Sequence, residues 1–223
     1  LVDLKSRTRQ LDADLVHALE ALFARYPEES QWAGRLGDVY FQRGELGKVL
    51  SLLTPLLKAG REGDPVQVRT WLLAAEAARS EGKLSNAIAL LERARALHPD
   101  NIAILNNLVY YLALSPQTVR RAQDLADELA RAPETFDRLD TLALVHLRAG
   151  RVAQATETMR RALQLVQRGD YAWHELYLNA AEIEWAAGRT REARRLVESV
   201  RSDPRRSGAD ESRARDLLEK MRN

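Results

Sequence analysis

Residues 68–100 read VRTWLLAAEAARSEGKLSNAIALLERARALHPD, and this stretch decides the fold. Counted from Val68, its apolar and punctuating residues stand at offsets 4, 7, 8, 11, 15, 20, 24, 27 and 32, in the order Trp71, Ala74, Ala75, Ala78, Gly82, Ala87, Leu91, Ala94 and Pro99. The apolar residues recur with helical spacing on both sides of Gly82, which predicts two helices joined by a short turn. Pro99 ends the second helix because proline cannot continue it.

The same ladder returns elsewhere in the chain, in units that start at Ser30, Ile102, Phe136 and His174. Their small and large residues fall near the same offsets, with a slip of one position in the second helix of the unit from Ile102. A helix–turn–helix unit of this length cannot bury its own apolar face, so it must stack on copies of itself. The sequence therefore predicts an array of stacked helix pairs.

This pattern resembles the tetratricopeptide repeat, which carries Trp, Leu-Gly, Tyr, Ala, Phe, Ala and Pro at the same offsets. The unit from Val68 to Asp100 matches best, and the resemblance covers nearly the whole chain. It implies an all-α fold, a right-handed α-solenoid of about five repeats with end-cap helices. It also implies that the function is to bind another macromolecule.

Each offset has a physical reason that is independent of the resemblance. Small residues such as Ala87 and Ala155 let neighbouring helices approach closely. The glycine after each first helix takes the left-handed conformation that ends a helix, at Gly44, Gly82, Gly150 and Gly188. The unit from Ile102 has Ser115-Pro116 in place of this glycine, and Pro55 is expected to kink its helix.

We expect the array to span residues 1–209, with a partial repeat at 1–29 and units at 30–67, 68–101, 102–135, 136–173 and 174–209. Extra residues lie at two junctions, around 60–65 and 167–170. Leu15, Leu19, Leu22 and Pro27 match the end of a repeat, which we interpret as the remainder of an earlier repeat; a lone capping helix is the alternative. A C-terminal capping helix is expected at 210–223, with Ala214, Leu217, Leu218 and Met221 on its inner face.

Neither the composition nor the motifs of the chain indicate a catalytic or metal-binding site. The chain has no cysteine, a formal net charge of +2, and no phosphate-binding loop, nucleophile elbow or zinc-protease helix. The histidines, His17, His98, His146 and His174, lie in separate units and are interpreted as structural. No apolar run is long enough for a transmembrane helix. We therefore expect no catalytic residues, no cofactor and no metal, and the chain is not predicted to be an enzyme.

The predicted binding site follows from the resemblance, because first-helix offsets 2, 5, 9, 12 and 13 face the concave groove of such arrays. In this chain the candidate groove residues are Asp38, Phe41, Leu72, Glu76, Arg79, Asn106, Tyr110, Asp140, Leu144, Arg148, Leu178, Glu182 and Trp185. Acidic residues outnumber basic ones at these offsets, and aromatic and aliphatic residues line them. The groove is thus predicted to bind an apolar or basic segment of a protein or peptide.

The leading interpretation is a non-catalytic interaction scaffold, one segment of a larger bacterial protein in an assembly, envelope or export process. The compartment, cytoplasmic or periplasmic, is left open, and the sequence allows a homo-oligomer. A regulatory array of a larger enzyme is the first alternative. A nucleic-acid binder is the second and is disfavoured: the basic stretch Arg189–Arg206 lacks interleaved aromatic residues.

Overall fold

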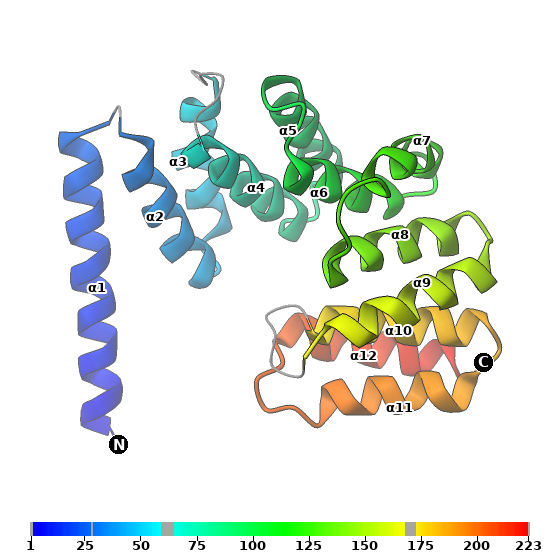
Figure 1. Ribbon diagram of the computed structural model, residues 1–223. Helices are drawn as coiled ribbons and strands as arrows, with labels where there is room; N and C mark the ends of the chain where they lie inside the picture. Colours follow the sequence, from blue (N-terminus) through cyan, green and yellow to red (C-terminus); the bar gives the residue numbers. More distant parts are fainter. Residues whose placement is uncertain (1, 28, 59–64, 168–172, 223) are drawn as a thin grey trace. The chain divides into compact units, whose positions relative to one another are not determined.

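The computed structural model describes residues 2–27, 29–58, 65–167 and 173–222, and these residues form helices joined by turns and loops. The helices are α1 (Val2–Arg25), α2 (Ser30–Gln42), α3 (Leu46–Lys58), α4 (Pro65–Ser80), α5 (Leu84–Leu97), α6 (Ile102–Ala113), α7 (Val119–Leu129), α8 (Phe136–Arg148), α9 (Val152–Leu165), α10 (Trp173–Ala186), α11 (Thr190–Arg201) and α12 (Gly208–Lys220) (Figure 1). The prediction of an all-α fold is confirmed for the described part of the chain. The junction predicted around 60–65 lies mostly outside the described residues, as does most of the junction at 167–170.

Helices α2 to α11 follow one another as pairs, and we call α2, α4, α6, α8 and α10 the first helices and α3, α5, α7, α9 and α11 the second helices. The first helices begin at Ser30, Pro65, Ile102, Phe136 and Trp173, within three residues of the unit starts read from the sequence. The two helices of a pair pack against each other in α2/α3, α4/α5, α8/α9 and α10/α11. The 34-residue ladder thus becomes a repeated helix hairpin.

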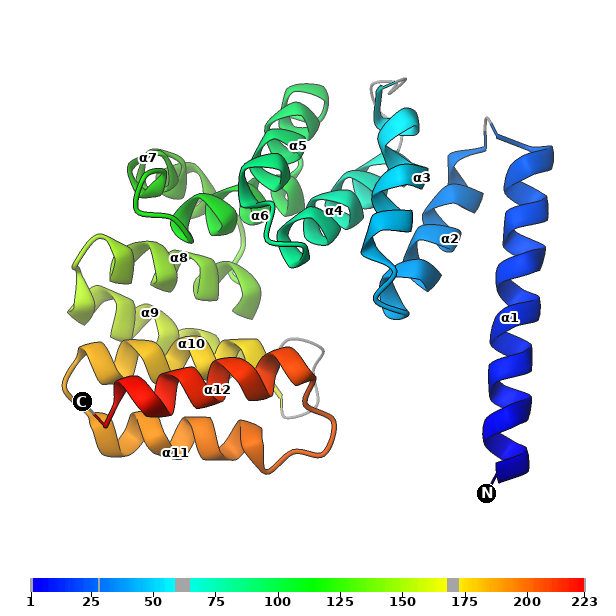
Figure 2. The same ribbon diagram turned by 180° about the vertical axis from the view of Figure 1, so that it is seen from behind.

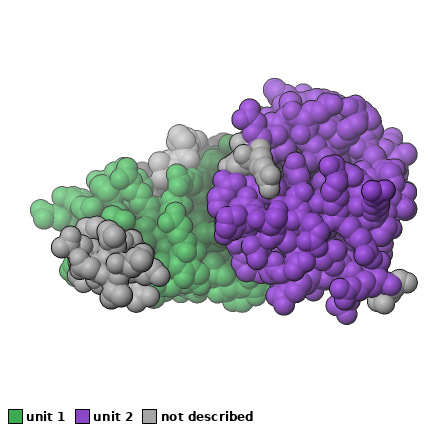
Figure 3. Space-filling model, turned by 90° about the horizontal axis from the view of Figure 1, so that it is seen from below, with its two compact units in different colours: residues 1–107 green, residues 108–223 purple. Residues whose placement is uncertain are grey.

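Contacts divide the chain into two compact units, unit 1 at residues 1–107 and unit 2 at residues 108–223, with the division inside α6 (Figure 3). The core of unit 1 gathers buried residues from Val16 to Ile104, with Trp71 and Leu53 fully buried. The core of unit 2 runs from Leu139 to Met221 around the buried Trp173. Trp71 and Trp173 therefore both pack in the interior, each in the core of its own unit.

The four turn glycines adopt the predicted left-handed conformation, with φ of 71°, 76°, 73° and 77° at Gly44, Gly82, Gly150 and Gly188. At each one the glycine N–H and the following N–H bond back to carbonyls of the last helical turn, as when Gly82 donates to the Arg79 carbonyl and Lys83 to the Ala78 carbonyl, both at 2.9 Å. This pair of hydrogen bonds is the Schellman motif, and glycine adopts its left-handed conformation without a steric penalty from a Cβ atom.

The third pair ends its first helix differently. The Thr118 hydroxyl donates to the Leu112 carbonyl at 2.6 Å, which satisfies a carbonyl at the end of α6 without a glycine. The following helix α7 has only 11 residues, and the connection from Ala130 to Thr135 leads to α8. This pair is the irregular one in the array.

The two ends of the chain are single helices. Helix α1 continues through residue 10, where a repeat would have its turn, so residues 2–25 form one uninterrupted helix. At the other end, Ala214, Leu217 and Met221 of α12 are buried and Leu218 is partly buried, which confirms the predicted inner face. Helix α12 packs against both α10 and α11 (Figure 1, Figure 2).

Small residues at the helix contacts make a first prediction about stability. Ala87 of α5 is fully buried, so Ala87→Leu adds a branched side chain where there is no room. We expect this overpacking to cost about 1–3 kcal/mol of unfolding free energy. Urea denaturation followed by circular dichroism measures it. Ala89→Leu, at an exposed position of the same helix, is the control and should change stability little; an equally small effect of Ala87→Leu would contradict the assigned register.

Candidate functional site

The first helices of unit 2 bring several candidate groove residues together. Arg148 of α8 donates to Glu182 of α10 at 2.7 Å, and the Tyr110 hydroxyl of α6 donates to Glu175 of α10. Trp185 lies three residues beyond Glu182 and is partly buried against the core of unit 2. The structure therefore joins side chains that are up to 65 residues apart in the sequence.

Besides Glu175, which stands at groove offset 2 of the unit from His174, two residues outside the candidate list complete this arrangement. Asn179 of α10 is 2 % exposed, and its amide nitrogen donates to both carboxylate oxygens of Asp140 at 2.9 and 2.8 Å. Arg213 of α12 donates to the amide oxygen of Asn179 and lies 3.5 Å from Glu182. Sequence analysis missed both because the repeat pattern assigns Asn179 to no groove offset and Arg213 to the solvated side of the cap.

Burial and hydrogen bonds shift the pKa values of this network in opposite directions. Burial raises the pKa of Asp140 to about 7, and the hydrogen bonds from Asn179 offset part of that effect. The net pKa of Glu182 is lowered. Burial alone would raise it, but the hydrogen bond from Arg148 and the charges of Arg148 and Arg213 outweigh burial. Burial and the neighbouring Glu175 raise the pKa of Tyr110 well above its usual range. Near neutral pH Tyr110 is thus neutral and Glu182 charged.

Some predicted groove residues offer a partner little surface. Leu144 is 2 % exposed and Leu178 is fully buried, so both contribute to packing, and Asp140 is 9 % exposed and hydrogen-bonded by Asn179. The half-buried or exposed members in unit 2 are Tyr110, Arg148, Glu182 and Trp185. The part of the predicted set that a partner can touch is accordingly narrower than the sequence offsets indicate.

In unit 1 the candidate residues form local pairs. Asp38 accepts a hydrogen bond from Arg69, and Arg79 donates to Glu76 at 2.9 Å. Phe41 and Leu72 are partly buried against the core of unit 1. Asn106 has a buried amide oxygen with no hydrogen-bond partner among the described residues. The acidic excess counted from the sequence is therefore partly neutralised by arginines of the same surface.

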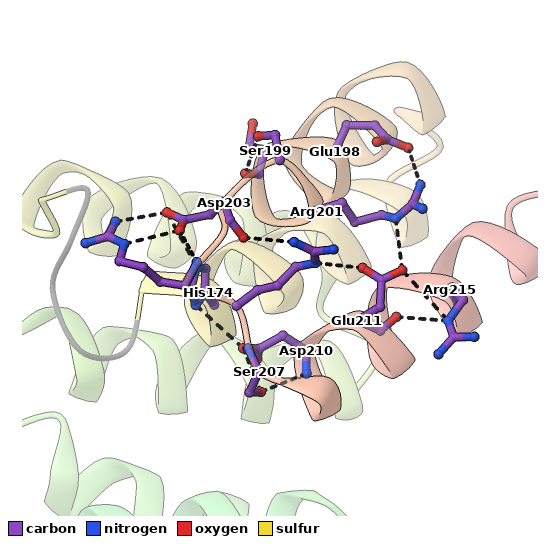
Figure 4. Close-up of polar contacts among 12 residues, drawn as sticks. His174, Glu198, Ser199, Arg201, Asp203, Ser207, Asp210, Glu211 and Arg215 are labelled. Atoms are coloured by element: carbon purple, nitrogen blue, oxygen red, sulfur yellow. Dashed lines mark hydrogen bonds and ion pairs between the residues drawn. The ribbon is translucent and has the colours of Figure 1, made fainter. Parts of the chain in front are cut away.

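The basic stretch Arg189–Arg206 is also largely paired with acidic groups. Arg201 lies 3.1 Å from Glu198 and 3.5 Å from Glu211, and Arg206 donates to Glu211 at 2.8 Å (Figure 4). Arg189, Arg195 and Arg205 form ion pairs with Glu184, Glu192 and Asp203. Because Glu and Asp side chains already form ion pairs with these arginines, the stretch is poorly suited to bind the phosphates of a nucleic acid.

His174 belongs to a cluster of polar side chains that connects α12 to the helices before it. Its Nε2 is 3.7 Å from Asp203 and its Nδ1 is 3.5 Å from Asp210, in the loop before α12 and in the first turn of α12 (Figure 4). Ser207 and Asp210 form a reciprocal capping box at the start of that helix. The cluster connects α10, α11 and α12, which is a structural role.

Among the described residues, no group of three or more His, Cys, Asp or Glu side chains is placed to hold a metal ion. None of the helices in the described ranges is both long and apolar enough to cross a bilayer.

Consecutive helix hairpins, left-handed glycine turns and a polar capping helix define the class as an α-solenoid repeat protein. Models of the tetratricopeptide repeat match residues 68–111 and residues 16–48. The chain therefore contains tetratricopeptide repeats, and proteins built from this repeat are in general non-catalytic interaction scaffolds. No curated protein matches the chain significantly.

Solved structures show the same fold at low sequence identity. A tetratricopeptide repeat protein from Parabacteroides merdae is 14% identical, covers 98% of this chain and 89% of its own, and has a TM-score of 0.67. A thermophilic repeat protein from Thermus thermophilus is 18% identical over 85% of this chain and 98% of its own, also with a TM-score of 0.67. BtubC from P. vanneervenii is 18% identical over 91% and 96%, with a TM-score of 0.61. These similarities support the fold only.

Proposed function

We propose that this chain is a scaffold that binds an apolar or basic segment of a partner protein on the first-helix surface of unit 2, centred on Tyr110, Glu175, Glu182 and Trp185. The segment would lie across α6, α8 and α10. The bacterial source of similar structures supports a bacterial protein, and we place it in a larger assembly or an envelope process.

The observation that carries this proposal is the state of Glu175. Its carboxylate accepts the Tyr110 hydroxyl, and it has no cationic partner among the described residues, whereas the nearby Glu182 has two arginines. A half-buried carboxylate beside an aromatic ring suits a lysine or arginine side chain, since the cation gains both an ion pair and a ring contact. Trp185, further along α10, supplies an aromatic anchor for an apolar residue.

The buried part of the network explains how the surface is held in place. Asn179 joins Asp140 of α8 to Arg213 of α12 below the exposed groups. Three helices therefore orient Arg148, Glu182 and Arg213 before any partner arrives. Preorganisation of this kind lowers the entropy that binding costs.

The test is capture of partners from a bacterial lysate, followed by affinity measurement with the captured segment. Tyr110→Ala/Trp185→Ala should abolish binding, and Glu175→Gln should weaken it about tenfold and reduce its dependence on salt. Glu219→Gln, an exposed position on α12, is the matched control and should bind normally.

Circular dichroism must first show that the variants keep their helicity. Equal affinity of Glu175→Gln and the native chain would contradict the proposed site. A second outcome would also contradict the proposed site: both the native chain and Tyr110→Ala/Trp185→Ala recover nucleic acid, and salt releases it. That outcome would favour binding through the basic stretch Arg189–Arg206.

A further inference from the structure

A second site lies on the other side of α8. A partly open cavity of about 430 Å³ lies between α7, the connection at 130–135, α8 and α9. On α8 it is lined by Arg138, Leu139, Leu142 and His146, whereas Asp140, Leu144 and Arg148 belong to the candidate groove. Positions two residues apart on a helix point in nearly opposite directions, so the cavity and the groove are separate surfaces.

The irregular third pair explains why a cavity is present here. Its second helix α7 is short and its repeat register is slipped by one position, so its side chains do not fill the space beside α8 and α9. The floor is apolar, with Ala126, Leu129, Leu139 and Leu142. A volume of this size falls in the range of small-molecule sites.

The charged residues of the cavity are balanced and divided between its walls. Asp124 and Asp127 come from α7, and Arg138 and Arg151 come from α8 and the start of α9. The remaining pair, Glu134 and Arg161, is satisfied internally by an ion pair. Neither Asp124 nor Asp127 has an ion-pair partner among the described residues, and both are exposed at the wall. The cavity thus presents two carboxylates from α7 that have no ion-pair partner among the described residues, and two guanidinium groups from α8 and the start of α9, of which Arg138 also donates to the Pro133 carbonyl.

His146 adds a polar group without a partner. It lines the cavity, and its Nδ1 is buried with no hydrogen-bond partner in the described part of the chain. Burial and the charge of Arg151 lower the pKa of His146, so the ring is neutral at neutral pH and adds no charge to either wall. A buried polar atom without a partner is costly unless a ligand or water satisfies it.

We propose that this cavity binds a small zwitterion whose ammonium and carboxylate groups are separated by methylene groups, of the chemical class of ω-amino acids and lysine. Its ammonium group pairs with Asp124 and Asp127, its carboxylate pairs with Arg138 and Arg151, and its methylene groups cover the leucine floor. A ligand of one charge would face the wall of equal charge without compensation, which is why both ends are required. This site is independent of the proposed peptide surface.

The experiment is a titration monitored by NMR and calorimetry with ε-aminocaproate, L-leucine and L-lysine as probes. Hexylamine and hexanoate, which keep the six-carbon chain of ε-aminocaproate but carry only one of its two charged ends, are the matched controls. We expect at least one zwitterion to bind at least about tenfold more tightly than either singly charged analogue, with amide shifts confined to 123–161. Equal binding of a singly charged analogue, or no binding of any zwitterion in the millimolar range, would overturn the proposal.

Variants of the two walls make the test sharper. Asp124→Asn/Asp127→Asn should reduce the affinity of the zwitterion to that of hexanoate, and Arg151→Gln should reduce it towards that of hexylamine. Asp216→Asn, an exposed carboxylate on α12, should leave binding unchanged. Glu175→Gln should also leave it unchanged, which separates this site from the peptide surface. The proposed zwitterion site would be refuted if Asp216→Asn lost binding. It would also be refuted if Asp124→Asn/Asp127→Asn and Arg151→Gln bound the zwitterion as tightly as the native chain.

Discussion

Trp71→Ala is expected to destabilise unit 1 by about 3–5 kcal/mol, the cost of deleting a large aromatic side chain from a core. Trp71 is fully buried, and it is the largest side chain in the core of unit 1. The helices around a deleted core side chain relax only partly, so removal of the indole leaves a cavity in this core. A loss of this size is comparable with the whole stability of a small domain.

The measurement is urea denaturation, with hydrogen exchange to locate the loss. Amides of unit 1 should lose protection first, since each repeat contacts only its neighbours. Trp32→Ala is the matched control: Trp32 is only half-buried, so its removal should cost much less. A uniform loss of protection along the chain would contradict this locality.

Trp71→Phe distinguishes packing from polarity at the same position. The indole N–H of Trp71 is buried without a hydrogen-bond partner among the described residues, and Arg93 lies 5.7 Å from the ring centroid. Phenylalanine keeps most of the apolar volume and removes the unsatisfied donor. We therefore expect Trp71→Phe to cost less than about 1.5 kcal/mol, and a cost equal to that of alanine would show that the indole N–H has a partner.

Asn179→Leu is expected to destabilise unit 2 by about 3–5 kcal/mol at pH 8 and by much less at pH 5. Leucine has a similar size but cannot donate to Asp140, and it removes the acceptor of Arg213. At pH 8 the substitution leaves a charged carboxylate buried without its donor. At pH 5 the carboxyl is protonated, so that cost is largely absent.

The sign of the pH dependence follows from the direction of the pKa shift. Burial raises the pKa of Asp140 from 3.8 to about 7, so the folded state binds this proton more tightly than the unfolded state. The stabilisation is complete below the unfolded pKa near 4 and is lost as the pH rises through about 7. Because the Asn179 hydrogen bonds lower that pKa, their removal raises it further and increases the loss at high pH.

The control is the same substitution in a chain with a neutral residue at position 140. In Asp140→Asn/Asn179→Leu no carboxylate is left to ionise, so the difference in stability between pH 5 and pH 8 should shrink to the contribution of the other titrating groups. Thermal denaturation at both pH values measures it. If the single and double variants show the same pH dependence, Asp140 is not the group responsible.

The repeat period, the helix pairs and their turns could be predicted from the sequence because each depends on residues within one or two helical turns. At Gly82 the helix ends through a hydrogen bond from the Gly82 N–H to the Arg79 carbonyl and one from the Lys83 N–H to the Ala78 carbonyl, all within five residues. The buried Ala87 and the inner face of α12 follow from the spacing of apolar residues alone. Local rules were therefore sufficient for the fold.

The candidate site could be predicted only in part, because groove offsets specify a helix face and not what lies against it. Leu144 and Leu178 occupy such offsets but are buried, since neighbouring helices cover them. Glu182 was counted among the acidic groove residues, and the structure pairs it with Arg148 and with Arg213. The peptide surface and the zwitterion cavity both stay predictions until binding is measured.

The sequence by itself determined that this chain is an all-helical repeat array, because helix propensity, turn glycines and apolar periodicity act over short stretches. Tertiary structure alone decided that Asn179 connects Asp140 to Arg213, that Glu175 accepts from Tyr110 and has no cationic partner within the described ranges, and that a cavity lies between α7 and α8. These features depend on distances of a few ångströms between residues that are 34 to 65 positions apart, and local sequence patterns carry no information about such distances.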